Sequence, residues 1–201
     1  MEPGRQWATW LHQALETYEV PNDLVGTVND RGEVIPARIF PVFRDEEELP
    51  VDAELISPIY RALDNSKYLL VICSPRAVAS AYVASEILYF KQLGREDRVL
   101  AAIVDGEPNV TQDLDKQVRG FRVVNECFPE PLRHKVDREG RLLRENTEPI
   151  AADFRLDEGG QGWCSPEAYR LDLQKDRELG AKTVEAKVAV CLLYTSPSPR
   201  D

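Results

Sequence analysis

The chain has 201 residues, of which 43% are hydrophobic and 30% are charged, and this balance is typical of a globular protein with room for one domain. Its formal net charge of -10 argues against binding to nucleic acid or to an anionic membrane, because both require clustered lysine and arginine. No apolar run approaches the ~20 residues that span a bilayer, and the four cysteines are scattered singly, so we expect a reduced, cytoplasmic protein.

The first part of the chain predicts a helix, a loop and a strand. Apolar residues recur at helical spacing from residue 5 to residue 18 and form one stripe: Trp7, Trp10, Leu11, Ala14, Leu15 and Tyr18. Residues 22–37 are polar and predict a loop or a short hairpin around Gly32. The β-rich run Arg38–Phe43 predicts a strand, and residues 44–51 form an acidic loop after it.

The next stretch alternates helix, strand and helix. Leu55, Ile59 and Leu63 form the stripe of a helix that follows the acidic loop, with Pro58 inside the pattern. Tyr68–Cys73 is nearly all apolar, as expected for a strand covered on both faces, and Ser80–Leu93 predicts a second helix. This order predicts a parallel sheet with covering helices, whose working cleft lies beyond the carboxyl ends of the strands.

Neither a hydrolase triad nor a metal site is predicted. Ser74 lacks the Gly-x-Ser-x-Gly context of an activated serine, and Cys73 fits a small buried hydrophobic residue better than a nucleophile. His134 and Cys164 are too distant and isolated in the chain to suggest metal ligands.

The rest of the chain predicts one strand and a long polar segment. Arg98–Val104 is apolar and strand-like, and it runs into the loop Asp105–Pro108. Residues 111–146 are polar, and we expect an irregular insertion there.

Three motifs in this order are similar to those of a known family. Phe43-Arg44-Asp45 precedes Leu49-Pro50, the strand Tyr68–Cys73 ends in Ser74, and Ser80–Glu86 fits the pattern Ser-x-Trp-Cys-x-x-Glu with Tyr82 in place of Trp and Val83 in place of Cys. Together they resemble the TIR (Toll/interleukin-1 receptor) domain in its bacterial form, and the similarity extends over roughly residues 7–190.

The resemblance implies a flavodoxin-like α/β fold, with a parallel sheet and helices on both of its faces. It makes residues 1–156 the TIR domain, with a last strand at 148–155, followed by a helical segment at 157–190. The family's first strand has no counterpart here, so we expect the native protein to begin earlier. Residues 191–201 look like a translated sequencing adapter, and we expect them not to be native.

The resemblance also implies an activity, which is cleavage of NAD+ between nicotinamide and ribose, with NAD+ as substrate and no cofactor or metal. Glu86 then matches the catalytic glutamate. Phe43, Arg44 and Asp45 would shape the nucleotide pocket together with Ser74 and Tyr82. Without the resemblance, Glu86 would be an ordinary helix-surface carboxylate with a basic partner.

Two other functions stay open from the sequence. TIR domains also assemble with one another, and residues 44–51 would then dock a second TIR domain in a signalling scaffold. A receptor that binds the nucleotide without cleaving it is equally compatible with the motifs. The resemblance further implies a setting in bacterial signalling or antiphage defence.

Overall fold

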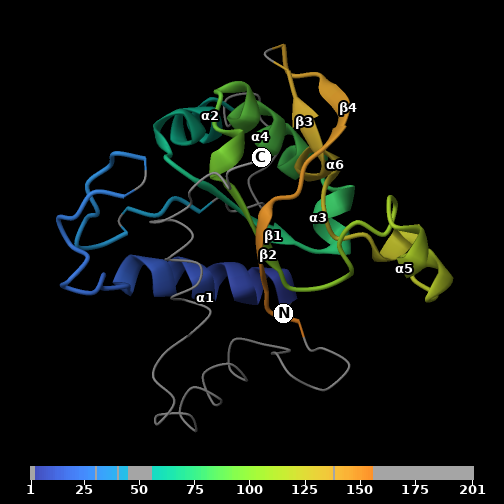
Figure 1. Cartoon of the computed structure of the whole chain (residues 1–201), viewed down its shortest axis with the longest axis horizontal. Helices are drawn as coiled ribbons and strands as arrows, with labels where there is room; N and C mark the ends of the chain where they lie inside the picture. The colour runs from blue at the N-terminus through green and yellow to red at the C-terminus, as the bar shows by residue number, and fades with distance from the viewer. Residues whose placement is uncertain (1–2, 30, 40, 45–55, 138, 156–201) are drawn as a thin grey trace, which may run out of the picture. The chain divides into compact units, whose positions relative to one another are not determined.

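The structure, a computed structural model, describes residues 3–29, 31–39, 41–44, 56–137 and 139–155 (Figure 1). The chain divides into two compact units, Met1–Arg44 with Trp163–Asp201, and Asp45–Gly162. Each unit is described by itself below. The predicted segments 157–190 and 191–201 lie outside the described residues.

The first unit is built on helix α1, Pro3–Thr17. The apolar stripe predicted for it is confirmed, since Trp7, Trp10, Leu11 and Leu15 are all buried. The Trp7 and Trp10 rings meet edge to face with centroids 5.5 Å apart, an arrangement that aromatic quadrupoles favour. Helical spacing alone therefore identified the buried face of this helix.

A short hairpin follows α1, as the polar segment predicted. Val28 and Val34 form an antiparallel bridge, and Gly32 occupies the turn between them with φ of 77°. The predicted strand Arg38–Phe43 is wrong for the residues described there. Arg38 forms only an isolated antiparallel bridge with Glu19, and Pro41, which has no N–H to donate, interrupts any ladder.

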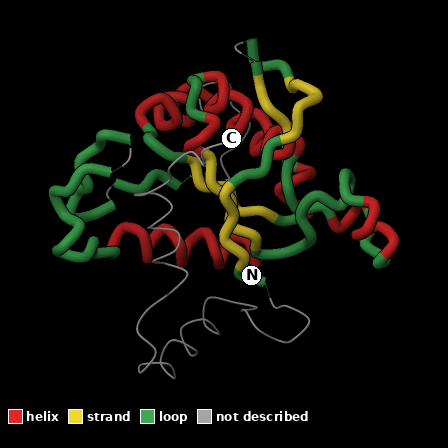
Figure 2. Tube along the Cα trace, viewed as in Figure 1, coloured by secondary structure: helices red, strands yellow, loops and turns green. Residues whose placement is uncertain are grey.

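The second unit contains a parallel sheet of three strands, β1 (Leu69–Cys73), β2 (Val99–Ile103) and β5 (Ile150–Asp153), in the order β1-β2-β5 (Figure 2). Leu69 pairs with Val99, and Leu100 pairs with Ile150. All five residues of β2 are buried, so this central strand is covered on both faces. The predicted parallel α/β fold is confirmed.

Two helices pack on one face of this sheet, α2 (Ile56–Asn65) and α4 (Ala81–Gln92). Their apolar side chains and alternate residues of β1 and β2 form a single cluster, whose members include Leu63, Val71, Cys73, Ile87, Phe90, Val99, Ala101 and Ile103. Pro58 falls in the first turn of α2, where its missing N–H leaves no hydrogen bond unmade. Both predicted helices are confirmed where they are described; Leu55 lies outside that part.

The segment predicted as an irregular insertion, 111–146, is instead made of short ordered elements. It contains α5 (Leu114–Val118), η2 (Val123–Asn125), α6 (Glu130–Arg133) and an antiparallel pair, β3 (His134–Val136) and β4 (Leu142–Asn146). Cys127, Phe128 and Leu132 join the main apolar cluster. Elements of three to five residues are too short to show a period, so the polar composition hid them.

Two further short helices complete the second unit, α3 (Pro75–Ala79) and η1 (Glu96–Arg98). Helix α3 follows β1 with only Ser74 between them. Among the described residues, no helix is both long and apolar enough to cross a membrane.

Candidate functional site

The carboxyl ends of the three parallel strands meet at one edge of the sheet. The Val104 N–H donates to the Cys73 carbonyl at 3.1 Å, and the Phe154 N–H donates to the Ile103 carbonyl at 2.9 Å. The residues that follow these strands are therefore neighbours, although they are distant in sequence. This edge is where open α/β sheets bind their ligands.

Ser74 follows β1 at this edge and caps helix α3. Its backbone is extended, and its Oγ accepts a hydrogen bond from the Ala77 N–H at 3.3 Å. Its carbonyl accepts from the Val78 N–H at 3.2 Å. This cap uses a lone pair of Ser74 Oγ and does not use the hydroxyl proton.

A single residue, Ser80, joins α3 to α4. Its N–H donates to the Ala77 carbonyl at the end of α3, and its Oγ accepts from the Val83 N–H at the start of α4, at 3.3 Å. Because only Ser80 lies between the two helices and bonds to both, we expect a shift of α3 to move the first turns of α4 as well.

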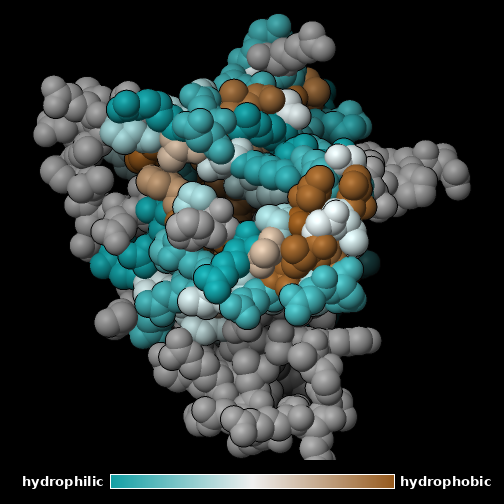
Figure 3. Space-filling view, turned by 90° about the vertical axis from the view of Figure 1, so that its left-hand side faces the viewer, coloured by the Kyte–Doolittle hydropathy of each residue, from teal (hydrophilic) through white to brown (hydrophobic). Residues whose placement is uncertain are grey.

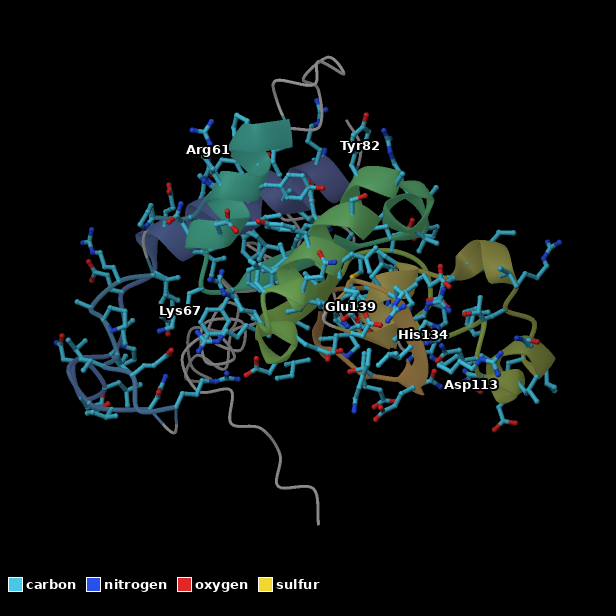
Figure 4. The ribbon with its side chains drawn as sticks, turned by 90° about the horizontal axis from the view of Figure 1, so that it is seen from above. Arg61, Lys67, Tyr82, Asp113, His134 and Glu139 are labelled. Atoms are coloured by element: carbon cyan, nitrogen blue, oxygen red, sulfur yellow. The ribbon has the colours of Figure 1, made fainter. Side chains whose placement is uncertain are left out.

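Helix α4 presents Tyr82 and Glu86 one turn apart, with Tyr82 on its exposed side and Glu86 at the border of its buried stripe. Tyr82 is 58% exposed and projects from the first turn (Figure 4), whereas Ile87 and Phe90 are 1% and 0% exposed. Glu86 is half-buried, as expected for a carboxylate at the border of an apolar face. Residues four apart lie on one side of a helix, so an aromatic ring and a partly desolvated carboxylate share one surface.

Phe43 and Arg44, predicted to shape the pocket, belong to the first unit. Phe43 is 58% exposed, and Arg44 Nη1 donates to Thr9 Oγ1 of α1 at 2.7 Å. Beside them, His12 Nε2 lies 3.0 Å from the Val42 carbonyl oxygen, and the His12 side chain is half-buried. Asp45 and the rest of the loop 44–51 lie outside the described residues.

A polar network that no local sequence pattern predicts lies on the loop after β2. Arg155, just beyond β5, donates from Nε and Nη2 to the two carboxylate oxygens of Asp153 at 2.9 and 2.7 Å. Its Nη1 donates to Glu107 Oε2 at 2.6 Å and to the Gly106 carbonyl. Lys116 Nζ lies 2.5 Å from Glu107 Oε1, so two cations hold this carboxylate.

The charges of this network shift the pKa values of its two carboxylates, Glu107 and Asp153. Burial alone would raise the pKa of Glu107, but the hydrogen bonds from Lys116 and Arg155 outweigh it and lower that pKa. The pKa of Asp153 is lowered in the same way, against burial, by Arg155. Both carboxylates are therefore ionised at neutral pH and bind the loop to the end of β5.

Glu126 holds the other end of the same loop. It is 2% exposed, and its Oε1 accepts from the N–H groups of Asn109 at 3.0 Å and Phe128 at 2.9 Å. Its Oε2 accepts from the Thr111 N–H at 3.2 Å and from the Thr111 hydroxyl at 3.1 Å. Asn109 has φ of 60°, a left-handed conformation that asparagine tolerates better than most residues.

Comparison with known proteins places this arrangement in a family. Residues 28–133 match the family model of the TIR domain, which is more than half of the chain. The chain belongs to the TIR domain family. The matched range is shorter than the resemblance inferred from the motifs, and it includes β1, both helices that meet at Ser80, and most of the short elements after β2.

The chain is also similar to a bacterial TIR protein whose name states an activity. It is 39% identical over 70 residues to the NAD(+) hydrolase ApTIR of an Actinoplanes species. The match covers 35% of this chain and 10% of the relative, so the chain corresponds to a small part of that protein's length. No solved structure matches the chain.

The cysteines in the described part of this TIR domain are not nucleophiles. Cys73 and Cys127 are both fully buried. Burial raises the pKa of the Cys73 thiol well above its usual value and raises the pKa of Cys127 to about 12. Within the described ranges, no group of three or more His, Cys, Asp or Glu side chains is placed to hold a metal ion.

Proposed function

We propose that this TIR domain hydrolyses NAD+ at the bond between nicotinamide and ribose, and that Glu86 is its catalytic carboxylate. The position of Glu86 carries the proposal. It is half-buried, it lies one turn from the exposed Tyr82 ring, and its helix follows the carboxyl end of β1 through α3. Family membership and the printed activity of the Actinoplanes relative support the same reaction.

The reaction requires few catalytic groups from the protein. Nicotinamide carries the positive charge in NAD+ and departs neutral, so the charge passes to the ribosyl C1′ as in glycoside hydrolysis. A carboxylate beside the ribose stabilises that developing charge more strongly when it is partly desolvated. Water adds to C1′ and releases one proton, which gives ADP-ribose, nicotinamide and H+.

The other predicted residues take binding roles in this proposal. The exposed Tyr82 ring offers a flat surface on which a heteroaromatic ring of the nucleotide can stack. Ser74 would donate its remaining proton at the edge of the sheet, whereas the pocket roles expected for Phe43, Arg44 and Asp45 stay predictions from the family resemblance. Each of these binding roles is a proposal, as is the catalytic role of Glu86.

Nicotinamide release from NAD+ tests the proposal. We expect Glu86→Ala and Glu86→Gln to lower kcat by at least about 100-fold, because both remove the negative charge that meets the transition state. Glu148→Ala removes an exposed carboxylate before β5 and serves as the matched control. Equal release by the parent and both Glu86 variants, with all of them folded, would remove Glu86 from the mechanism.

Assembly with other TIR domains is a second candidate function. One face of the molecule shows hydrophobic side chains gathered among hydrophilic ones (Figure 3), as is common where proteins associate. Phe43, at the start of the loop 44–51, is also largely exposed. Sedimentation of the parent and of Glu86→Ala over a range of concentrations separates this role, since a scaffold would associate equally well without the carboxylate.

NAD+ binding by calorimetry addresses the receptor alternative. A receptor would bind NAD+ and release no nicotinamide, in the parent and in Glu86→Ala alike.

A further inference from the structure

Gly106 lies where the loop after β2 comes closest to helix α3. It has φ of +81°, and a Cβ atom added to it would lie 2.7 Å from the Asn125 carbonyl oxygen and 2.8 Å from Pro75 Cδ. Real Cβ atoms do not approach other atoms so closely, so the backbone of this loop is in direct contact with the Pro75 ring.

Pro75 is the first residue of α3, so the loop lies against the start of this helix, whose other end meets α4 at Ser80. A contact that holds Pro75 in place therefore holds α3 in place. Because Ser80 joins α3 to α4, the same contact also holds the first turns of α4. Those turns carry Tyr82 and Glu86.

The loop itself is held at both ends. Glu107 is bound by Lys116 and Arg155, and its backbone N–H donates to the Asn125 carbonyl at 2.7 Å. Glu126 accepts hydrogen bonds from Asn109 and Thr111 further along. Hydrogen bonds to a buried charge are among the stronger ones in proteins, so the loop is a firm support.

We infer that residues 105–111 form a buttress that sets the position of Glu86, and that Gly106 is its positioning residue. The inference rests on the proposed function for the reaction that Glu86 performs. The buttress touches α3, and it acts on the carboxylate only through the α3–α4 junction. Displacing a catalytic group by ~1 Å can lower a rate by as much as ~100-fold, so a small shift at Pro75 is enough to matter.

A pair of glycine variants separates the contact from backbone strain. Gly106→Ala introduces a left-handed alanine and also clashes with the Asn125 carbonyl oxygen and with Pro75. Gly120→Ala introduces only the left-handed alanine, because Gly120 has φ of +97° and no atom within 4 Å of a built Cβ. We expect Gly106→Ala to lower kcat for nicotinamide release by about tenfold or more, with KM within about twofold of the parent, and Gly120→Ala to leave both unchanged.

Hydrogen exchange provides a measurement that does not depend on hydrolysis. We expect Gly106→Ala to speed exchange of the amides that bond to the capping serines of α3 and α4, namely Ala77, Val78 and Val83, and Gly120→Ala not to do so. A parent that releases no nicotinamide would refute the proposed function, whereas the exchange comparison would still decide whether the buttress exists.

Two results would overturn the inference. One is an unchanged kcat in Gly106→Ala when release by the parent depends on Glu86. The other is faster exchange in Gly106→Ala confined to residues 105–111. If Gly106→Ala does not fold, Pro75→Ala removes the ring carbons at the same contact without a clash, and we expect it to lower kcat by about threefold and to speed exchange at Val78. If Pro75→Ala changed neither kcat nor the exchange at Val78, the buttress would be refuted.

Discussion

Helix α4 and the loop 105–111 both belong to the second unit, but they are specified in different ways. The cap of α4 comes from Ser80, and its stripe of Val83, Ile87 and Phe90 repeats within the helix itself. The loop is held by Lys116, Glu126 and Arg155, which lie 8 to 49 residues away from their partners in it. The residue proposed for catalysis thus sits on a locally encoded helix, while its support depends on contacts that only folding creates.

The largest expected effect is on the loop. Glu126→Ala removes the acceptor of three backbone N–H groups and a hydroxyl in a site that is 2% exposed. Because the Phe128 N–H stays buried and the Asn109 and Thr111 donors stay partly buried without this acceptor, we expect the free energy of unfolding to fall by about 3–5 kcal/mol. Urea denaturation at neutral pH measures it.

The control for this variant is Glu130→Ala, an exposed carboxylate in the first turn of α6. We expect its cost to stay within about 0.5 kcal/mol. If the two variants lose similar stability, the network around Glu126 does not hold the loop.

An effect of intermediate size is expected on the pH dependence of stability. Glu107 has a folded-state pKa below its ordinary value of 4.5, so its contribution to stability is present above that value and is lost as the pH falls through the folded-state pKa. Asp153, with a lowered pKa and an ordinary value of 3.8, behaves in the same sense. Arg155→Gln removes the shared partner, so we expect it to be less stable than the parent at pH 7 and to lose less stability on acidification.

Urea denaturation of the parent and Arg155→Gln at pH 7, 5 and 3 tests this, with the difference between the two shrinking towards pH 3. A difference that does not depend on pH would show that Arg155 acts through packing alone.

The smallest expected effect is on α4. Ser80→Ala removes the side-chain acceptor of the Val83 N–H, and we expect a cost of about 1 kcal/mol. Ser80→Asp keeps an acceptor and adds a charge that the helix N-terminus favours, so it should retain most of the parent's stability. Thermal unfolding followed by circular dichroism compares the three proteins. Equal losses in Ser80→Ala and Ser80→Asp would exclude capping as the role of Ser80.

Two wrong predictions show where local patterns mislead. Arg38–Phe43 has the composition of a strand, but a strand requires a partner ladder, and the described residues there make only one isolated bridge. Residues 111–146 have the composition of a loop, yet Cys127, Phe128 and Leu132 enter the core from elements too short to show a period. In both segments the outcome depends on which distant residues come near.

The sequence by itself determined the helix α1 and its buried stripe, the strands β1 and β2, and the helix that carries Glu86. These elements combine a repeated apolar pattern with a local signal for their ends, and both act between residues close in the chain. Tertiary structure decided the rest, namely the support of the loop by Glu126 and Arg155 and the contact of Gly106 with Pro75. Hydrogen bonds and close packing depend on distances in space, and residues dozens of positions apart come within reach only when the sheet brings its strand ends together.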